Sequence, residues 1–160
     1  MSKGDRRQSM KTRGFECVTS WADENIHLPE RKTASSAGYD IEAGKSVTIA
    51  SGESVLVPTG IKAYMQPDEV LAVYIRSSLG VKKKLVLTNS TGIIDADYYN
   101  NKDNEGHIYI ALWNRGEQTV SIQKGERIAQ GIFQKYLTVD GDKAGDGVVR
   151  QGGFGSTGKA

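Results

Sequence analysis

The spacing of apolar residues is what most limits the possible folds of this chain. Nowhere do apolar side chains recur with the period of about 3.6 residues that marks an amphipathic helix. Instead, short apolar or alternating segments follow one another, separated by turn-forming residues such as Gly52 and Pro58–Gly60. Many short, regularly spaced strands are typical of β-sandwiches and barrels. The sequence therefore predicts an all-β domain, with strands over residues 14–20, 46–50, 54–57, 61–64, 70–75, 85–88, 108–113, 120–122 and 127–137.

Length and charge narrow the class of protein. A chain of 160 residues can bury one hydrophobic core, so we expect a single domain. Lys and Arg number 21 against 19 Asp and Glu, and this near balance gives no reason to expect nucleic-acid binding. The single cysteine, Cys17, excludes an internal disulfide and fits a reducing compartment. Because the sequence shows no signal peptide and no membrane-spanning apolar run, we expect a cytoplasmic protein that binds no membrane.

The two ends of the chain differ in composition from its centre. Residues 1–13 are polar and carry most of the positive excess, so we expect a flexible N-terminal extension. Residues 14–137 contain the predicted strands and form the expected β core. Residues 138–160 are rich in glycine and aspartate and have too few apolar groups for a core of their own. This C-terminal arm is either disordered or folds onto something else.

The stretch Thr91–Tyr98 is a candidate catalytic motif. Two isoleucines favour a strand, and Asp95, Asp97 and Tyr98 follow within the next few residues. Gly92, before them, can supply backbone angles that other residues resist. A carboxylate at the end of a rigid strand is well placed to act as a general base. The alternative is a hairpin with a solvated acidic turn, and so short a motif does not by itself separate the two interpretations.

Three other segments combine residue types that bind anions. The run Arg76–Ser78 offers a guanidinium and two hydroxyls to phosphate oxygens, or else forms a surface turn. Gln130 could offer its amide to an anion, or could be structural. The glycine-rich segment 152–158 resembles a backbone nest for anions, and Phe154 within it is suited to stacking on a base. For this segment the alternative is a disordered tail.

Nitrogen and sulfur ligands for a metal are scarce. His27, His107 and Cys17 cannot form the common kinds of zinc site. Oxygen ligands, and therefore Mg²⁺, are the better expectation if a metal is needed. Asp40 follows a Gly-Tyr pair and could bind a metal ion or a metal-held water, or could cap its own turn.

Taken together, these segments resemble the motifs of the trimeric dUTPases, enzymes that hydrolyse dUTP to dUMP and pyrophosphate. A single motif would be weak support, but all five family motifs occur in the expected order within residues 14–158. The resemblance implies a distorted jelly-roll (β-clip) barrel, a homotrimer with shared active sites, and a mobile C-terminal arm that closes over each site. The matching segments are Ala37–Ala43, Arg76–Gly80, Asn89–Tyr98, Gly125–Gln130 and Gly152–Gly158.

The resemblance also implies roles for individual residues. Asp95 would activate the attacking water, and Asp40 would hold Mg²⁺ through the water shell of the ion. Tyr98 would pack against the deoxyribose and exclude a ribose 2′-hydroxyl. The groups that would read or stack on the uracil are Asn89, the hairpin backbone at Gly92 and Ile94, and Phe154. The groups that would contact or close over the phosphates are Arg76, Ser77, Ser78, Gln130, Arg150, Gly155, Ser156 and Thr157.

Three features depart from the family pattern. Ile75 stands where many members have proline, and an extended residue still suits the turn that follows. A polar insertion occupies residues 100–105, which we expect to lengthen a loop near the entrance of the site. Arg150 lies closer to Phe154 than the usual spacing, so its phosphate contact is less secure than the role of Phe154.

Two alternatives to a simple dUTPase arise from the same resemblance. The homologous dCTP deaminases carry a glutamate on the strand that corresponds to residues 108–114, where this chain has Ala111, which cannot shuttle protons. Some phage members also engage repressor proteins, and the insertion at 100–105 makes a second role conceivable without supporting it. We therefore expect dUTP and further copies of this chain as partners, with Mg²⁺ as the cofactor.

Overall fold

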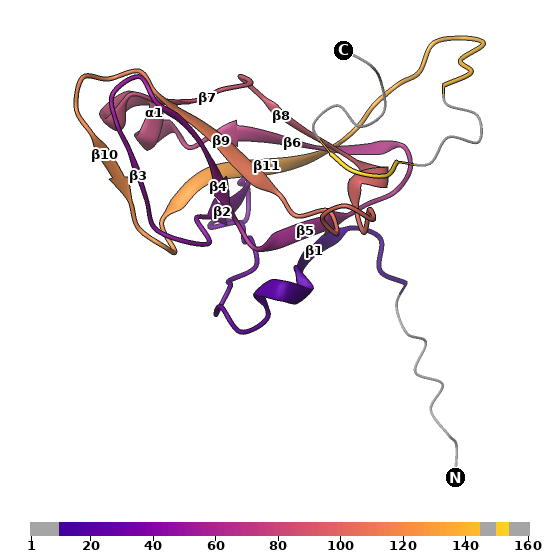
Figure 1. Ribbon diagram of the computed structural model, residues 1–160. Coiled ribbons are helices and arrows are strands. Elements are labelled where there is room, and N and C mark those ends of the chain that lie inside the picture. Colours follow the sequence, from indigo (N-terminus) through magenta and orange to yellow (C-terminus); the bar gives the residue numbers. More distant parts are fainter. Residues whose placement is uncertain (1–9, 145–149, 154–160) are drawn as a thin grey trace.

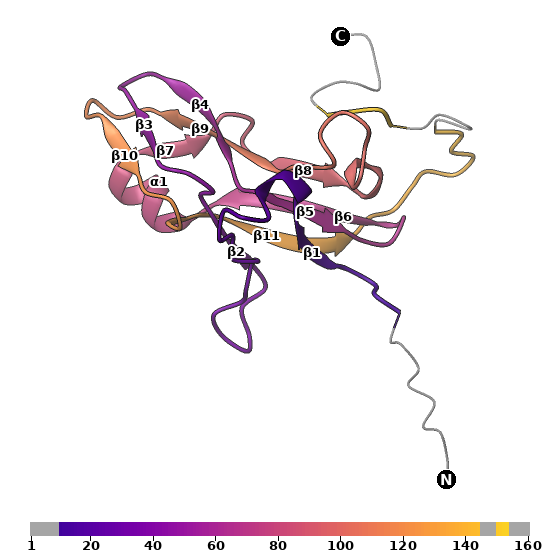
Figure 2. The same ribbon diagram turned by 60° about the horizontal axis from the view of Figure 1, so that its bottom comes forward.

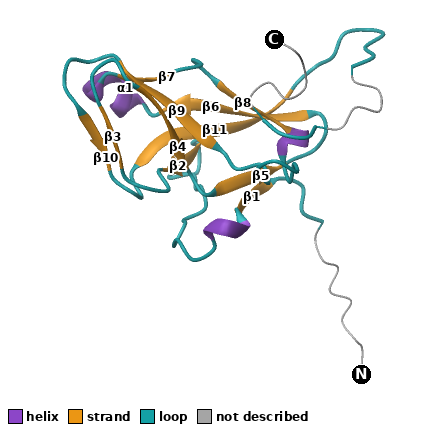
Figure 3. Cartoon of the chain, viewed as in Figure 1, coloured by secondary structure: helices purple, strands orange, loops and turns teal. Residues whose placement is uncertain are grey.

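The computed structural model describes residues 10–144 and 150–153 (Figure 1). Strands dominate these residues, and helix is confined to one short α-helix and two 3₁₀ turns (Figure 3). The strands are β1 (Gly14–Cys17), β2 (Tyr39–Glu42), β3 (Val47–Ile49), β4 (Ser54–Pro58), β5 (Ile61–Tyr64), β6 (Glu69–Ile75), β7 (Leu85–Leu87), β8 (Gly92–Asp95), β9 (Tyr109–Asn114), β10 (Val120–Ile122) and β11 (Arg127–Lys135). The helical segments are η1 (Thr19–Trp21), α1 (Ser77–Lys83) and η2 (Ala96–Tyr98). None of the helices described is long and apolar enough to cross a membrane.

The strands pair into four small antiparallel sheets. The largest has the order β2-β11-β6-β8, and a second has the order β4-β9-β7. Two further pairs, β1-β5 and β10-β3, complete the β structure of the described residues. Figure 2 shows β4 and β9 above β6 and β11, so the two larger sheets face each other. This arrangement leaves β8 at one edge of the largest sheet.

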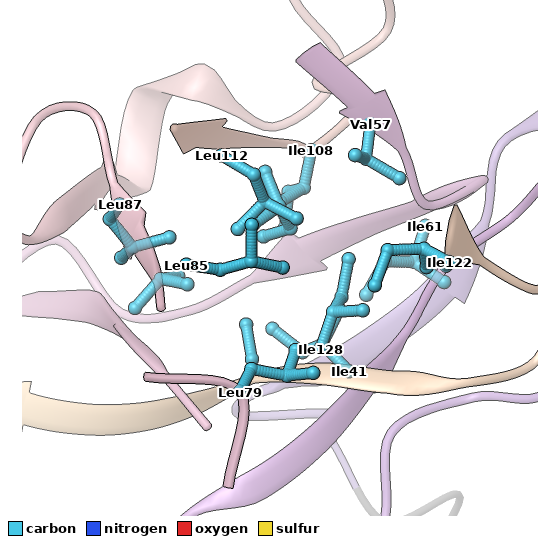
Figure 4. Close-up of a cluster of buried hydrophobic side chains, with 14 of the residues drawn as sticks. Ile41, Val57, Ile61, Leu79, Leu85, Leu87, Ile108, Leu112, Ile122 and Ile128 are labelled. Atoms are coloured by element: carbon cyan, nitrogen blue, oxygen red, sulfur yellow. The ribbon is translucent and has the colours of Figure 1, made fainter. Parts of the chain in front are cut away.

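The hydrophobic core lies between these sheets and follows from the alternation of apolar residues. In β9, Ile110 and Leu112 are buried, whereas Trp113 between Leu112 and the end of the strand is exposed. Figure 4 shows Leu112, Leu85 and Ile128 gathered in one cluster of buried side chains. Burial of apolar surface stabilises a fold by roughly 25 cal/mol per Å². The cluster therefore fixes β6 and β9, on which the candidate site is built.

The strand predictions are confirmed, with boundaries that differ by up to three residues. The run Arg76–Gly80 is different, because most of it belongs to α1 and does not form the surface turn that one interpretation of the sequence expected. The helix has only seven residues, too few to show a clear helical period, and it contains Gly80 in its centre. It ends at Lys84, whose φ of 55° is left-handed. The mostly β architecture is as predicted.

Candidate active site

Asp95 ends β8, the edge strand beside β6. Antiparallel pairing places Gly92 opposite Val73 and Asp95 opposite Val70. A β-carbon at Gly92 would lie 3.1 Å from the β-carbon of Val73, so glycine allows β8 to approach its neighbour closely. The chain then turns into η2, and the Asp95 side chain remains 50% exposed at the end of the strand. This carboxylate is therefore accessible to a water molecule and a ligand.

Tyr98 is carried into the protein by the turn η2 and is only 8% exposed. Its hydroxyl donates to the backbone oxygen of His107 at 2.6 Å and accepts from Asn104 Nδ2 at 2.8 Å. Burial raises the pKa of the Tyr98 hydroxyl, so the group stays protonated and acts as a donor at neutral pH. The ring is thus held at both its backbone and its hydroxyl end.

A cavity of about 350 Å³ opens between the β8 hairpin and β9. Sites of roughly this volume hold small organic ligands. The structure brings several of the predicted site residues to its walls, and it adds Ala111 and Ile110 from β9. The predicted residues that line it are Asn89, Gly92, Ile94, Asp95, Tyr98 and Arg150. The walls of this one cavity therefore contain residues predicted to contact the base, the sugar and the attacking water.

The segment Arg150–Gly153, which we call the strap, lies beside this cavity (Figure 1, yellow). Arg150 donates from Nη2 to Asp95 Oδ2 and from Nε to Asp97 Oδ1, each at 2.7 Å. Its side chain is 14% exposed, whereas both carboxylates are at least half exposed. The guanidinium that was predicted to contact phosphate therefore contacts two carboxylates in this structure, one of them the predicted base.

A second group of predicted residues lies around β11 and the start of α1. Gln130 on β11 is opposite Asp40 on β2, and Asp40 Oδ2 contacts Arg127 Nη1 at 3.2 Å. Arg76, between β6 and α1, donates its backbone N–H to the oxygen of Ile128 at 3.1 Å. We call the predicted residues at this end the Arg76 cluster, whose members are Asp40, Arg76, Ser77, Ser78 and Gln130.

Strand geometry separates the cavity from the Arg76 cluster. Asp95 lies opposite Val70 near the start of β6, and Arg76 follows the end of the same strand. Because a strand rises about 3.3 Å per residue, the step from Val70 to Arg76 corresponds to about 20 Å. No member of the Arg76 cluster is among the described residues that line the cavity. Asp95 and Arg76 of one chain therefore lie at opposite ends of β6.

The chemistry of the Arg76 cluster fits a magnesium ion that arrives with its ligand. Asp40 supplies one partly exposed carboxylate. Nowhere in residues 10–144 and 150–153 do three or more His, Cys, Asp or Glu side chains gather as a preformed metal centre. Mg²⁺ commonly keeps several waters and is held by one or two carboxylates together with substrate phosphates. A single carboxylate near residues that are predicted to bind phosphate would be a suitable donor set for such an ion.

The groups that support Tyr98 were not identified from the sequence. They are Asn101, Asn104 and His107, to which the sequence assigned no role. Asp97, which binds Arg150, was noted only as part of its motif. The available signal was the concentration of Asn and Asp in residues 100–105, since these residues favour turns that bond to their own backbone. Four predicted residues lie outside the described part of the chain, namely Phe154, Gly155, Ser156 and Thr157.

Comparison with known sequences identifies relatives of one kind. The dUTPase family model matches residues 24–158. The chain is 55% identical to the deoxyuridine 5′-triphosphate nucleotidohydrolase of Lactococcus lactis subsp. lactis (strain IL1403), over 93% of this chain and 99% of that protein. It is 40% identical to the enzyme of the same name from Shigella sonnei (strain Ss046), over 82% of this chain and 87% of the relative.

Solved structures agree with the sequence comparison. The dUTPase of Streptococcus mutans matches with a TM-score of 0.76 and 53% identity, over 80% of this chain and 99% of that chain. A dUTPase from phage phi11 of S. aureus, which coordinates a structural Mg(II) ion, matches with a TM-score of 0.68 over 84% of this chain and 97% of that chain. At 21% identity, the likeness to the phage protein shows the fold alone.

These findings favour neither alternative considered from the sequence. The relatives named above are dUTPases, and Ala111, at the position where the resemblance leads us to expect a glutamate in the deaminases, lines the cavity. The phage likeness is limited to the fold and gives no support for a repressor-binding role. The match of the family model, the identity of more than half to a curated relative and the structural match together place the chain in the dUTPase family, whose enzymes hydrolyse dUTP.

Proposed function

We propose that the chain forms a homotrimer and hydrolyses dUTP to dUMP and pyrophosphate in active sites shared between neighbouring subunits. The observation that carries this proposal is the separation of about 20 Å along β6 between Asp95 and Arg76. A cyclic assembly in which the cavity of one chain meets the Arg76 cluster of the next would complete three equal sites.

The cavity is suited to a deoxyuridine group. The Asn89 amide and the backbone of the β8 hairpin line it and would pair with the uracil edge. Cytosine would leave these groups without partners, which is a strong basis for rejection. The Tyr98 ring forms the wall that we assign to the deoxyribose, where a 2′-hydroxyl would have no room.

The reaction that we propose is an in-line attack of water on the α-phosphorus. Asp95 would accept the proton of the water as its oxygen bonds to phosphorus, while the bond to the bridging oxygen breaks and pyrophosphate leaves. Arg76, Ser77, Ser78 and Gln130 of a neighbouring subunit would donate to the phosphate oxygens, with the guanidinium supplying positive charge.

Magnesium is the cofactor that we infer for this reaction. When bound, Mg²⁺ neutralises charge on the triphosphate and on the departing pyrophosphate. Asp40 would hold the ion through its waters, and the contact with Arg127 Nη1 at 3.2 Å orients the carboxylate for this task.

The strap would change partners when the nucleotide binds. Arg150 is paired with Asp95 and Asp97 in this structure. A triphosphate offers the same guanidinium denser negative charge, so Arg150 would exchange the carboxylates for phosphate oxygens. That exchange would free the Asp95 carboxylate for the water. Phe154 would stack over the uracil as the arm closes, which would exclude other water from the site.

We place this activity in the cytoplasm, which suits the free thiol of Cys17.

Subunit mixing tests the shared site directly. Asp95→Asn and Arg76→Ala trimers would each be nearly inactive, but trimers refolded from an equal mixture would contain some sites with both residues intact. Random assembly predicts recovery of about one quarter of wild-type activity per site. A control pair, Asp95→Asn with Asn89→Ala, alters the cavity in both partners and should show no such gain. Absence of recovery in the first pair, with trimers confirmed by light scattering, would show that each site lies within one chain.

A further inference from the structure

The insertion of residues 100–105 is an ordered element and has a compact fold of its own. We call Asn100–Glu105 the 100–105 loop. Its ends are closed by a backbone bond from Asn100 N to Glu105 O and another from Glu105 N to Asn101 O, both 3.0 Å. Asn100 and Glu105 have φ angles of 55° and 62°, so the chain reverses sharply at both ends. A loop with these internal hydrogen bonds is rigid enough to hold the groups that it contacts in place.

One side of the 100–105 loop is fastened to the β core. Glu105 Oε1 accepts from Lys62 Nζ and from Thr19 Oγ1, each at 2.7 Å. Lys62 is only 8% exposed and also donates to Asn100 Oδ1 at 2.6 Å. These bonds lower the pKa of the Glu105 carboxyl, the largest cause being the bond from Lys62. The loop is therefore tied to β5 by an ion pair whose lysine is buried and whose carboxylate is 30% exposed, and to η1 by the Thr19 hydroxyl.

The other side of the loop reaches the candidate sugar wall. Asn104 Nδ2 donates to the Tyr98 hydroxyl at 2.8 Å, and Asn104 Oδ1 accepts from Asn101 Nδ2 at 2.8 Å. Asn101 is 7% exposed and also donates to the backbone oxygen of Tyr98 at 2.8 Å. The hydroxyl itself donates to His107 O. Displacing the Tyr98 ring would therefore break bonds to two different parts of the chain.

The loop also meets the strap. Asp103 N donates to the backbone oxygen of Gln151 at 3.1 Å, and a β-carbon at Gly152 would lie 3.0 Å from Asp103 Cβ. A β-carbon at Gly153 would lie 2.7 Å from Tyr98 Cε2. The strap thus packs against both the loop and the tyrosine ring, and glycine is needed at both contacts.

We propose that Asn104 is a positioning residue that holds Tyr98 in place and thereby sets the preference for deoxyribose over ribose. This rests on the proposed role of Tyr98 as the wall against a 2′-hydroxyl. A steric filter discriminates only as far as its wall resists displacement. The Asn104 amide supplies that resistance by fixing the hydroxyl end of the ring from a loop that is anchored independently through Glu105.

The test compares kcat/KM for dUTP with kcat/KM for UTP. Asn104→Ala should lower the dUTP-to-UTP ratio by about tenfold, chiefly because UTP is accepted better. Tyr98→Phe removes the hydroxyl, and with it both the bond from Asn104 and the bond to His107 O, so its fall should be at least as large. The double variant should fall no further than Tyr98→Phe alone, because that variant has already lost the bond from Asn104. A purely structural loosening would lower both kcat/KM values together and leave the ratio unchanged.

Lys102→Ala is the matched control, since this exposed side chain belongs to the same loop and should leave the ratio unchanged. If Asn104→Ala does not fold, Asn104→Leu, which fills similar space without the amide, takes its place, and an unchanged ratio in Tyr98→Phe overturns the proposal. Tyr98→Ala tests the sugar role of Tyr98 separately from the positioning role of Asn104. An unchanged ratio in Tyr98→Ala refutes the sugar role itself, whereas a fall in Tyr98→Ala without a fall in Asn104→Ala refutes only the positioning role of Asn104.

Discussion

The cavity beside β8 and the Arg76 cluster differ in how deeply their side chains are buried and in how much charge they carry. In the cavity, Tyr98 is buried and its hydroxyl has two partners, while Asn101 behind it is almost fully enclosed. In the Arg76 cluster, Ser77 is exposed, and the Asp40–Arg127 ion pair is open to solvent on both sides. The tyrosine wall of the cavity is fixed by neutral hydrogen bonds within a single chain, whereas the Arg76 cluster presents partly exposed charge.

The difference matches the two parts of the proposed ligand. A base and a sugar are distinguished from close relatives by shape and by uncharged hydrogen bonds, which requires rigid walls. A triphosphate is bound mainly by charge, and exposed ion pairs contribute little until the ligand displaces their water. Arg150 is the exception at the cavity, because it is a phosphate-binding type of residue and is held there by Asp95 and Asp97.

The largest effect is expected from Asp95→Asn. The amide keeps the shape of the side chain but cannot take a proton from water, and general bases contribute about 10²- to 10⁴-fold to rate. We expect kcat for dUTP to fall by at least about 100-fold, while the affinity for a non-hydrolysable dUTP analogue is retained, since the base and sugar contacts are unchanged. Retention of more than about a tenth of wild-type kcat, a loss of only ~1.4 kcal/mol, would remove Asp95 from this role.

A somewhat smaller effect is expected from a chain truncated after Val149, which lacks the strap and Phe154. Stacking of a base on an aromatic ring is worth roughly 1–3 kcal/mol, so loss of Phe154 alone would weaken binding or closure by about fivefold to about 150-fold. The truncated chain should still fold, because within residues 10–144 and 150–153 the hydrophobic core contains no residue beyond β11. Steady-state hydrolysis of dUTP, with light scattering as the control for assembly, checks this.

Phe154→Trp in the full chain sharpens the same comparison. Its fluorescence should change when the nucleotide binds and return to the starting level as product leaves. Full dUTP hydrolysis by the truncated chain would mean that the arm contributes nothing to the site and that the cavity is complete without it.

The sequence predicted the regular part of the fold because that part follows from a local pattern. Alternating apolar residues and turn residues placed the strands, as in β9, where Ile110 and Leu112 face the core. The motif around Asp95 and Tyr98 was found for a similar reason, since a few adjacent residues form one hairpin and its following turn. Helix α1 was missed because seven residues are too short for a periodic signal.

Contacts between distant segments could not be predicted in this way. The ion pairs of Arg150 with Asp95 and Asp97 span more than fifty residues, and no local pattern encodes them. The 100–105 loop was recognised as a polar insertion, but its effect on Tyr98 depends on the direction of the Asn104 side chain, which only the folded loop defines. The proposed division of the site between chains rests in the same way on β6 as a whole, because that strand sets the distance between its two ends.

The smallest effect in this series is expected from Glu105→Gln, which tests how the cavity side is fastened. Lys62 is buried, and Glu105 is its charged partner at 2.7 Å. Glutamine keeps an acceptor for that ammonium, and Asn100 Oδ1 remains bonded to it, so loss of the negative charge should lower the free energy of unfolding by only about 0.5–1.5 kcal/mol. The pKa of Glu105 is lowered from 4.5 by its bonds to Lys62 and Thr19. A carboxyl with a lowered folded-state pKa contributes stability above its unfolded-state pKa and loses that contribution as pH falls through the folded-state pKa. The difference in free energy of unfolding between wild type and Glu105→Gln should therefore be largest near pH 7 and become smaller below a pH of about 4.5.

Urea unfolding at fixed protein concentration across this pH range measures this difference, with Glu117→Gln, at an exposed position, as the control. A difference that stays constant with pH would show that the shape of residue 105, and not its charge on Lys62, secures the loop.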